Sequence, residues 1–421
     1  MICHAASIVH SDTRKNVVPK QSLLSEIPSH RALQFIILLG IISLFADMTY
    51  EGARSITGPY LAFLGANALT VGFVSGCGEF IGYGLRFVSG YLADRTGKYW
   101  MITLIGYACN LLAVPLLALT HHWEIAAFLM ILERMGKAIR TPPRDAMLSH
   151  AGQMVGMGWG FGLHEALDQM GAFLGPILVA IVLYLQGNYQ ASFAILLIPA
   201  LFSLALLFYA RWLYPHPQAL EAEQDRFDMN EAQSKTFWCY LIGASFIAAG
   251  YADFPLIAFH FVKMSILPSL WIPIAYAIAM GVDGIAAPFL GHLYDKSGFV
   301  ILIIITLLSC LFAPFVFLGG FKLALFGVIL WSIGVGAHES LMRAVVANMV
   351  PQHKRASAYG LFNMSYGVFW LLGSVLMGLL YDTYIPAVVI FSILMQLAAV
   401  PLLWFVMKKT KKDPRHRMNK K

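Results

Sequence analysis

The sequence predicts an all-α integral membrane protein with twelve transmembrane helices, arranged as two pseudo-symmetric six-helix bundles. Three observations support this fold class. The chain is 59% hydrophobic and only 12% charged, whereas soluble domains are nearer half apolar and a quarter charged. Its apolar residues fall in runs of about 20, the length needed to cross about 30 Å of hydrocarbon. Several motifs also recur at an offset of about 200 residues.

The apolar runs define the expected spans and the organisation of the chain. The spans are predicted at residues 32–62, 69–91, 100–119, 122–141, 160–184, 190–212, 237–262, 270–292, 299–318, 322–347, 357–381 and 385–407. They give a cytosolic tail at 1–31, a first bundle at 32–212, a cytosolic linker at 213–236, a second bundle at 237–407 and a basic cytosolic tail at 408–421. Residues 1–31 lack the apolar core and cleavage site of a signal peptide.

Basic residues lie mainly on one side of the predicted spans. The loops on the N-terminal side carry Arg95, Lys98, Arg144, Arg226, Lys235, Lys296, Lys354 and Arg355, and the loops on the other side carry only Lys263 and Lys322. By the positive-inside rule, both termini face the cytosol. The net charge of +7 therefore indicates orientation and contact of the C-terminal tail with anionic lipid, rather than nucleic-acid binding. The five cysteines are isolated, so we expect no disulfide framework, no metal site and no cofactor.

Polar turns and glycine motifs repeat between the two halves. Gly90-Tyr-Leu-Ala-Asp94-Arg95-Thr-Gly97-Lys98 is a short polar turn between two apolar runs, and Gly291-His-Leu-Tyr-Asp295-Lys-Ser-Gly298 is its degenerate copy. Phe161-Gly-Leu163 likewise aligns with Tyr359-Gly-Leu361, and Arg144 with Arg343. Two parallel six-span repeats with a site at their interface are typical of transporters.

The first turn resembles the loop between helices 2 and 3 of the major facilitator superfamily, whose pattern is Gly-x-Leu-x-Asp-Arg-x-Gly-Arg/Lys. Arg134-Met-Gly-Lys-Ala-Ile-Arg-Thr-Pro-Pro-Arg-Asp-Ala146 is similar to the span-4 signature of a bacterial subgroup, with Ala138 in place of the usual Gly. Residues 161–176 and Asp47-Met-Thr-Tyr-Glu51 also resemble that subgroup. The resemblance implies the fold, alternating access and a bacterial inner membrane, but it names no cargo. Only Gly171-x-x-x-Gly175-Pro176 matches the span-5 motif of drug-proton antiporters, too little to imply drug export.

Ionisable residues are unusually frequent inside the predicted spans. A charge at the bilayer centre is costly, so such groups should face a cavity or a partner. The expected proton-coupling and substrate-cavity residues are Asp47, Glu51, Glu79, Arg86, Glu133, Arg134, Asp168, Asp253, Asp283 and Glu339. Among them Asp47, Glu79, Glu133 and Asp168 are the candidate proton sites, with Arg86 and Arg134 as counter-ions. The alternative is that these residues form permanent ion pairs, and His164 is interpreted as a packing histidine. Phe254, Trp331, Phe362, Tyr366 and Trp370 should shape more of the substrate wall.

A second group of polar residues is expected at the cytosolic face. The resemblance implies a gate formed by Gly90, Asp94, Arg95, Gly97, Arg140, Arg144, Asp295 and Arg343. In it, Asp94 would pair with Arg140 or Arg144, or face the N-terminal end of span 11, when the cytosolic side is closed. Pro142 and Pro143 are expected to end span 4, since neither donates a helical hydrogen bond. The alternatives are a surface salt bridge at Asp94 and a static Glu339–Arg343 pair.

The resulting prediction is a monomeric secondary active transporter that moves a small solute by alternating access, coupled to protons. Export by antiport is favoured. Proton-coupled uptake of a nutrient or siderophore-like solute and a non-transporting sensor remain open alternatives, and a channel fits the buried charges less well. No enzyme is expected, because the sequence carries no His-Glu-x-x-His, Gly-x-Ser-x-Gly or phosphate-binding Gly-x-x-x-x-Gly-Lys-Ser/Thr motif.

Overall fold

The computed structural model describes residues 20–155, 157–215, 235–349 and 355–412. The first half contains α1 (Lys20–Phe63), α2 (Ala68–Thr96), α3 (Tyr99–Leu116) with the 3₁₀ turn η1 (Leu117–Leu119), α4 (Trp123–Val155), α5 (Met157–Gln186), and α6 (Tyr189–Ile195) with α7 (Leu197–Leu213). The second half contains α8 (Lys235–Gly250) with α9 (Phe254–Lys263), α10 (Trp271–Ser297), α11 (Phe299–Ser309) with α12 (Phe312–Leu318), α13 (Phe321–Met349), α14 (Arg355–Thr383) and α15 (Ile385–Lys412).

The predicted all-helical fold with twelve spans is confirmed for the part of the chain that the structure describes. Where two segments follow each other across a short break, as in α8 and α9, they count as one span. Within the described ranges, ten segments are long and apolar enough to cross a membrane, and Phe321–Ala337 in α13 is a shorter apolar helix. The remaining span, α4, is the one interrupted by charges, including Glu133, Arg134 and Lys137.

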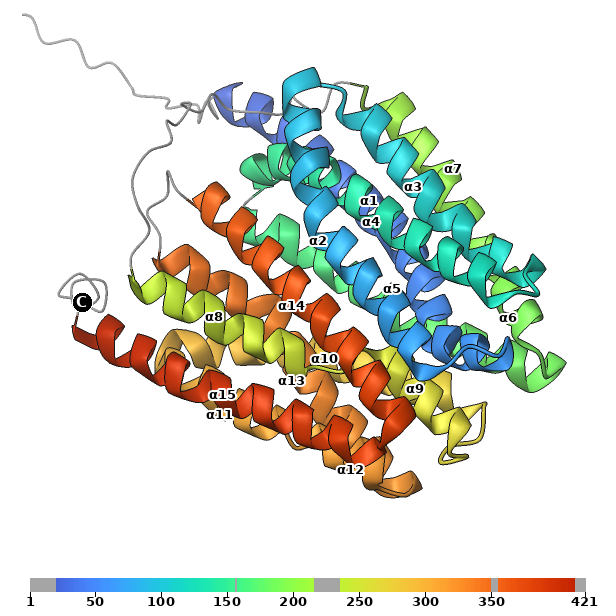
Figure 1. Cartoon of the computed structure of the whole chain (residues 1–421). Helices are drawn as coiled ribbons and strands as arrows, with labels where there is room; N and C mark the ends of the chain where they lie inside the picture. Colours follow the sequence, from blue (N-terminus) through green and yellow to red (C-terminus); the bar gives the residue numbers. More distant parts are fainter. Residues whose placement is uncertain (1–19, 156, 216–234, 350–354, 413–421) are drawn as a thin grey trace, which may run out of the picture.

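The helices run between two sides of the molecule. The terminal side, as we call it, carries the start of α1, the turn at Gly97 and the end of α15, and the far side carries the turns at Gly65 and Gly187 (Figure 1). Gly97 ends α2 in the left-handed region, with a φ of 65°, a conformation that glycine adopts at little cost. The long helices of both halves therefore lie roughly side by side across one membrane thickness.

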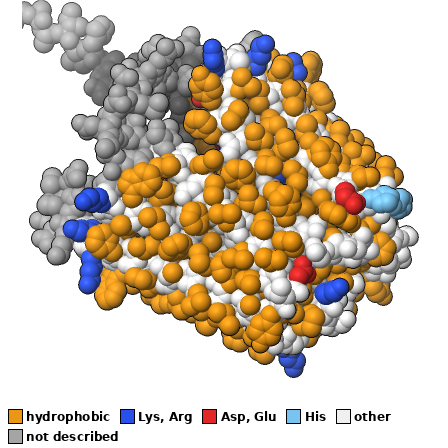
Figure 2. Space-filling view, in the orientation of Figure 1, with side chains coloured by type: hydrophobic (Ala, Val, Ile, Leu, Met, Phe, Trp, Pro, Cys, Tyr) orange, Lys and Arg blue, Asp and Glu red, His pale blue; other side chains and the backbone are white. Residues whose placement is uncertain are grey.

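Apolar side chains cover the face shown in Figure 2, and most of its charged side chains gather toward the two ends. Exposed apolar residues of this kind suit a lipid environment. Inside the molecule, one buried apolar cluster continues from the far-side part of the first half, around Tyr60 and Val71, into the second half. A separate cluster, around Phe35 and Tyr107, fills the terminal side of the first half. The two halves thus share a core on the far side.

The prediction that Pro142 and Pro143 end span 4 is wrong, because α4 continues through both prolines to Val155. A proline at position 142 removes the N–H that would bond to the carbonyl of Ala138, four residues earlier. Ser89 of α2 replaces it, since its hydroxyl donates to the Ala138 carbonyl oxygen at 3.1 Å. A neighbouring serine that satisfies a freed carbonyl is a usual reason why a membrane helix tolerates proline.

Candidate functional site

A polar cavity of about 350 Å³ lies between the two halves. Its lining extends from Arg54 and Asp253, near the middle of the molecule, to Asp145 and Phe161, toward the terminal side. The carboxylates that line it are Asp47, Glu51, Glu79, Asp145, Glu165, Asp168, Asp253 and Asp283, and the cationic side chains are Arg54, Arg86, Arg134, Lys137, Arg140 and Arg144. Volumes of this order hold small-molecule ligands.

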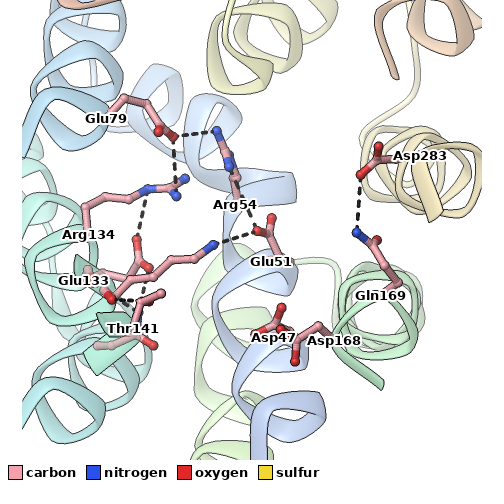
Figure 3. Close-up of polar contacts among 12 residues, drawn as sticks. Asp47, Glu51, Arg54, Glu79, Glu133, Arg134, Thr141, Asp168, Gln169 and Asp283 are labelled. Atoms are coloured by element: carbon pink, nitrogen blue, oxygen red, sulfur yellow. Dashed lines mark hydrogen bonds and ion pairs between the residues drawn. The ribbon is translucent and has the colours of Figure 1, made fainter. Parts of the chain in front are cut away.

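Five ionic residues of α1, α2 and α4 form a connected network on one wall of the cavity (Figure 3), with Arg54 and Glu51 of α1 themselves 4.0 Å apart. Arg54 donates to the Glu79 carboxylate at 3.0 Å, and Arg134 approaches the same carboxylate oxygen at 3.5 Å. Lys137 lies 3.6 Å from Glu51. Each charge therefore has an opposite charge beside it, which offsets the cost of removing it from water.

Two contacts carry this network across to the second half. Arg54 donates to the Asp253 carboxylate at 2.6 Å, and the Tyr276 hydroxyl donates to Glu51 at 2.5 Å. Asp253 lies in the break between α8 and α9, where its side chain also caps the first N–H of α9. The α1 segment around Glu51 and Arg54 thus contacts both halves at the inner end of the cavity.

A second ionic group joins α1, α4 and α5. Asp47 lies 3.5 Å from Arg140, while Asp168 lies 3.8 Å from Arg144 and 3.5 Å from His164. Asp47 and Asp168 lie near each other (Figure 3), and one oxygen of each is buried without a hydrogen-bond partner among the described residues. The negative charges of these two carboxylates are therefore less fully balanced by cations and hydrogen bonds than the charge of Glu79.

The glycines of α5 explain why these carboxylates lie together. Gly171 packs against the backbone of Leu44 and the side chain of Asp47, and Gly175 packs against the backbone of Met48. A Cβ atom at either glycine would collide with α1. In membrane proteins, small residues spaced by four allow two helix backbones to approach closely in this way. The close approach of α5 to α1 brings Asp168 to the same level as Asp47.

Aromatic side chains of the second half face the ionic wall. The cavity lining includes Tyr276, Trp331, Phe362, Tyr366 and Trp370. Tyr366 stacks on Phe362 with ring centroids 5.5 Å apart, and Trp370 lies 5.6 Å from Tyr366. Phe254, which was expected in this wall, instead packs behind it, with its ring 4.3 Å from that of Tyr276. The cavity thus has one ionic wall and one aromatic wall.

Of the other predicted cavity residues, Arg86 and Asp283 line the cavity and Glu133 does not. Glu133 lines a separate small pocket and accepts a hydrogen bond from Asn110 at 2.8 Å. The Arg86 guanidinium lies over the Tyr83 ring, 5.6 Å from its centroid, and Gln169 donates to Asp283 at 3.4 Å. The side chain of Glu339 lies outside the described residues.

The described part of the predicted gate shows no ion pair at Asp94 in this conformation. Asp94 accepts a hydrogen bond from the Tyr99 hydroxyl at 2.9 Å, while Arg140 and Arg144 extend into the ionic group around Asp47 and Asp168. The predicted pairing of Asp94 with either arginine is therefore absent here. The side chains of Asp295 and Arg343 lie outside the described residues, and Gly90 packs against Pro142. Arg95 lies on the exposed end of α2, 3.5 Å from the Tyr91 hydroxyl.

Three residues that organise the site were not among the predicted cavity residues: Arg54, Lys137 and Tyr276. A helical signal for Arg54 was present, because it lies three residues after Glu51 and seven after Asp47 on one face of α1. Lys137 lies four residues after Glu133 on α4, but it pairs with Glu51 of another helix. No local pattern marks Tyr276. Among the described residues, no group of three or more His, Cys, Asp or Glu side chains could hold a metal ion.

Two pseudo-symmetric helical halves with a polar cavity between them are the architecture of secondary transporters. The family model of the Major Facilitator Superfamily matches residues 36–374, with a second match over 271–421. The chain belongs to the major facilitator superfamily and is a multi-pass membrane transporter.

Relatives and solved structures agree with this assignment. The chain is 39% identical over 385 residues to an uncharacterized protein of Mycobacterium tuberculosis, with 90% of this chain and 94% of the relative covered. It is 29% identical over 378 residues to an uncharacterized MFS-type transporter of Methanocaldococcus jannaschii, with 86% and 93% covered. A mutant form of the nucleoside transporter NupG superposes with a TM-score of 0.71 at 15% identity, with 89% of this chain and 99% of that one covered, which shows a common fold.

Proposed function

We propose that this protein is a proton-coupled secondary transporter that moves a small solute by alternating access. The observation that carries the proposal is the ionic cavity between the halves. Its lining residues extend toward the terminal side. Buried charges in a membrane protein usually mark a substrate or ion pathway. Rocking of the two halves about this cavity would expose it to one side of the membrane at a time.

Asp47 and Asp168 are the proposed proton sites. Two neighbouring carboxylates repel each other when both are charged, and binding one proton removes that repulsion. Arg140 and Arg144 lie 3.5 Å and 3.8 Å from them, so a small movement of α4 would change how well each charge is balanced. Glu79 is the weaker candidate, because Arg54 and Arg134 both lie against it.

The ionic wall and the aromatic wall together favour one class of solute. Charged groups of such a solute would bind to the ionic wall, and a planar or apolar part would pack on the aromatic wall. Trp370 lines the cavity, and its indole N–H is buried without a hydrogen-bond partner among the described residues. A solute with an acceptor group near its planar part would satisfy this donor, so we propose an amphipathic, aromatic or heterocyclic solute.

We further propose that the terminal side faces the cytosol of a bacterial inner membrane, and that the protein acts as a monomer. The exposed basic residues Arg95, Lys98 and Lys296 lie on this side, as the positive-inside rule requires. At the end of α15, Lys408 lies over the Trp404 ring at 4.4 Å. Such a pair suits the membrane interface, where the lysine can reach anionic headgroups.

The test is solute flux in proteoliposomes containing the full chain and a trapped pH-sensitive dye. The probes are aromatic amines, aromatic amino acids and aromatic carboxylic acids, with imposed pH gradients of either sign. We expect the transport of one probe class to be accompanied by proton movement. We also expect Asp47→Asn and Asp168→Asn to lower the pH-driven flux of that probe at least tenfold. Proton movement opposite to the solute would support export by antiport, and movement with it would support uptake by symport.

Two results would contradict the proposal. Unchanged pH-driven flux in Asp47→Asn, Glu79→Gln, Glu133→Gln and Asp168→Asn would show that these carboxylates carry no coupling proton. Binding of a probe without flux under any gradient would indicate the sensor alternative.

A further inference from the structure

Two side chains cap the N-terminus of α2 by accepting hydrogen bonds from its first backbone N–H groups. Asn67, the N-cap residue, accepts from the N–H of Thr70 at 2.9 Å. The N–H groups of Ala68 and Leu69 bond instead to Asp382, at 3.1 and 2.9 Å, one to each carboxylate oxygen. Asp382 lies at the C-terminal end of α14, in the other half. One half thus caps a helix of the other.

This cap lies where the two halves close the far side. Gly72 of α2 packs against the backbone at Ser374 of α14, and Gly378 of α14 packs against the backbone of Ala68. A Cβ atom at either glycine would collide with the facing backbone, so both glycines are needed for this approach. Separation of the helix ends by a few ångströms would break both hydrogen bonds of Asp382, because such bonds weaken steeply beyond about 3.2 Å.

We propose that Asp382 is a gating residue, a cross-half N-cap that selectively stabilises the conformation closed on the far side. Asn67 belongs to the same half as α2, so its hydrogen bond persists whether the far side is open or closed. The Asp382 hydrogen bonds exist only in the closed arrangement. A contact made in one conformation alone shifts the equilibrium between the two by its full strength. The inference rests on the alternating access proposed above.

The expected effect follows from the usual strength of helix caps. Loss of a side-chain N-cap, together with the favourable effect of a negative charge at a helix N-terminus, shifts an equilibrium about fivefold. Removing Asp382 should therefore raise the ratio of far-side-open to far-side-closed molecules about fivefold. Removing Asn67 should weaken α2 in both conformations and leave this ratio unchanged.

The experiment measures the distance between two spin labels on the far side of the full chain in lipid nanodiscs. The labels are attached at Leu119→Cys in the first half and Leu318→Cys in the second, both exposed positions, after the native cysteines have been replaced by alanine. Wild-type background, Asp382→Ala, Asp382→Asn and Asn67→Ala are compared. Glu124→Gln is the matched control, since it removes an exposed carboxylate from the first turn of α4, on the same side.

The inference predicts a growing long-distance population in Asp382→Ala and, more weakly, in Asp382→Asn, which keeps one acceptor oxygen. Asn67→Ala and Glu124→Gln should match the background. An unchanged ratio in both Asp382 variants would overturn the inference while leaving alternating access intact. An equal shift in Asn67→Ala would also overturn it, because general weakening of α2 would then suffice. A single distance in every variant would contradict both the inference and alternating access.

Discussion

At the scale of single residues, Arg54 is the most connected charge of the site. It bonds to Glu79 of its own half and to Asp253 of the other, and the Asp253 side chain is only 3% exposed. The Arg54 guanidinium has several donors in a rigid fork, so it can serve two carboxylates at once. Stability and contact between the halves therefore depend on the same side chain.

Replacing Arg54 by alanine should lower the free energy of unfolding by about 3 kcal/mol, because a nearly buried Asp253 carboxylate loses its cation. Arg54→Lys should have an intermediate effect, since an ammonium lacks the fork. Thermal unfolding in detergent measures both, and Arg95→Ala, at the exposed end of α2, is the control. Adding Asp253→Asn to Arg54→Ala should recover part of the loss, and failure to do so would show that the pair is not coupled.

The two cavity tryptophans should respond differently to the same substitution. The Trp331 indole donates to the Ala252 carbonyl at 2.8 Å, so Trp331→Phe should cost about 1 to 3 kcal/mol by leaving a buried acceptor unpaired. Trp370→Phe removes a donor without a described partner and should change stability by less than about 1 kcal/mol, while weakening binding of the transported probe about fivefold. Thermal unfolding with and without the probe separates the two effects. Equal stability losses would mean that Trp370 has a structural partner.

At the scale of elements, α4 shows how a neighbouring helix satisfies the carbonyl that a proline, Pro142, leaves free. Ser89→Ala should lower the free energy of unfolding by about 1 to 3 kcal/mol, because the Ala138 carbonyl would be left without a donor. Ser149→Ala is the matched control, since the Ser149 hydroxyl donates to the Ala146 carbonyl of its own helix. Pro142→Ala restores a backbone N–H at the right position and should rescue Ser89→Ala. If thermal unfolding shows no rescue, the freed carbonyl is not the cause of the loss.

At the scale of the whole molecule, close backbone contacts on the far side hold the halves together. Gly72→Ala would place a methyl group against the carbonyl of Ser374, so we expect it to favour the far-side-open conformation. Hydrogen–deuterium exchange of the amides at the start of α2 should then become at least fivefold faster. Gly82→Ala, in the same helix but with open space around the position, should leave exchange unchanged. Equal exchange in both variants would contradict a packing role for Gly72.

The sequence was sufficient for the parts of the protein that depend on periodicity and length. Twelve apolar runs, two repeated halves and a charged α4 follow from the requirement that a helix crossing lipid be long and apolar. The same reasoning placed Asp47, Glu51, Glu79 and Asp168 in a cavity, because a charge in hydrocarbon needs a polar environment. The ion pairs were less predictable from the sequence, because Lys137 lies four residues after Glu133 and yet pairs with Glu51 of another helix.

Only the tertiary structure decided which of the charged side chains meet and which end of the molecule is closed. The Arg54–Asp253 bond, the Tyr276–Glu51 bond and the Asp382 cap of α2 join residues about 200 or more positions apart, and no local pattern encodes such pairs. The passage of α4 through Pro142 depends in the same way on a serine hydroxyl of α2. Length, charge and helical period by themselves determined the family architecture, because the membrane constrains each span separately, whereas contacts between helices depend on the packing of the whole chain.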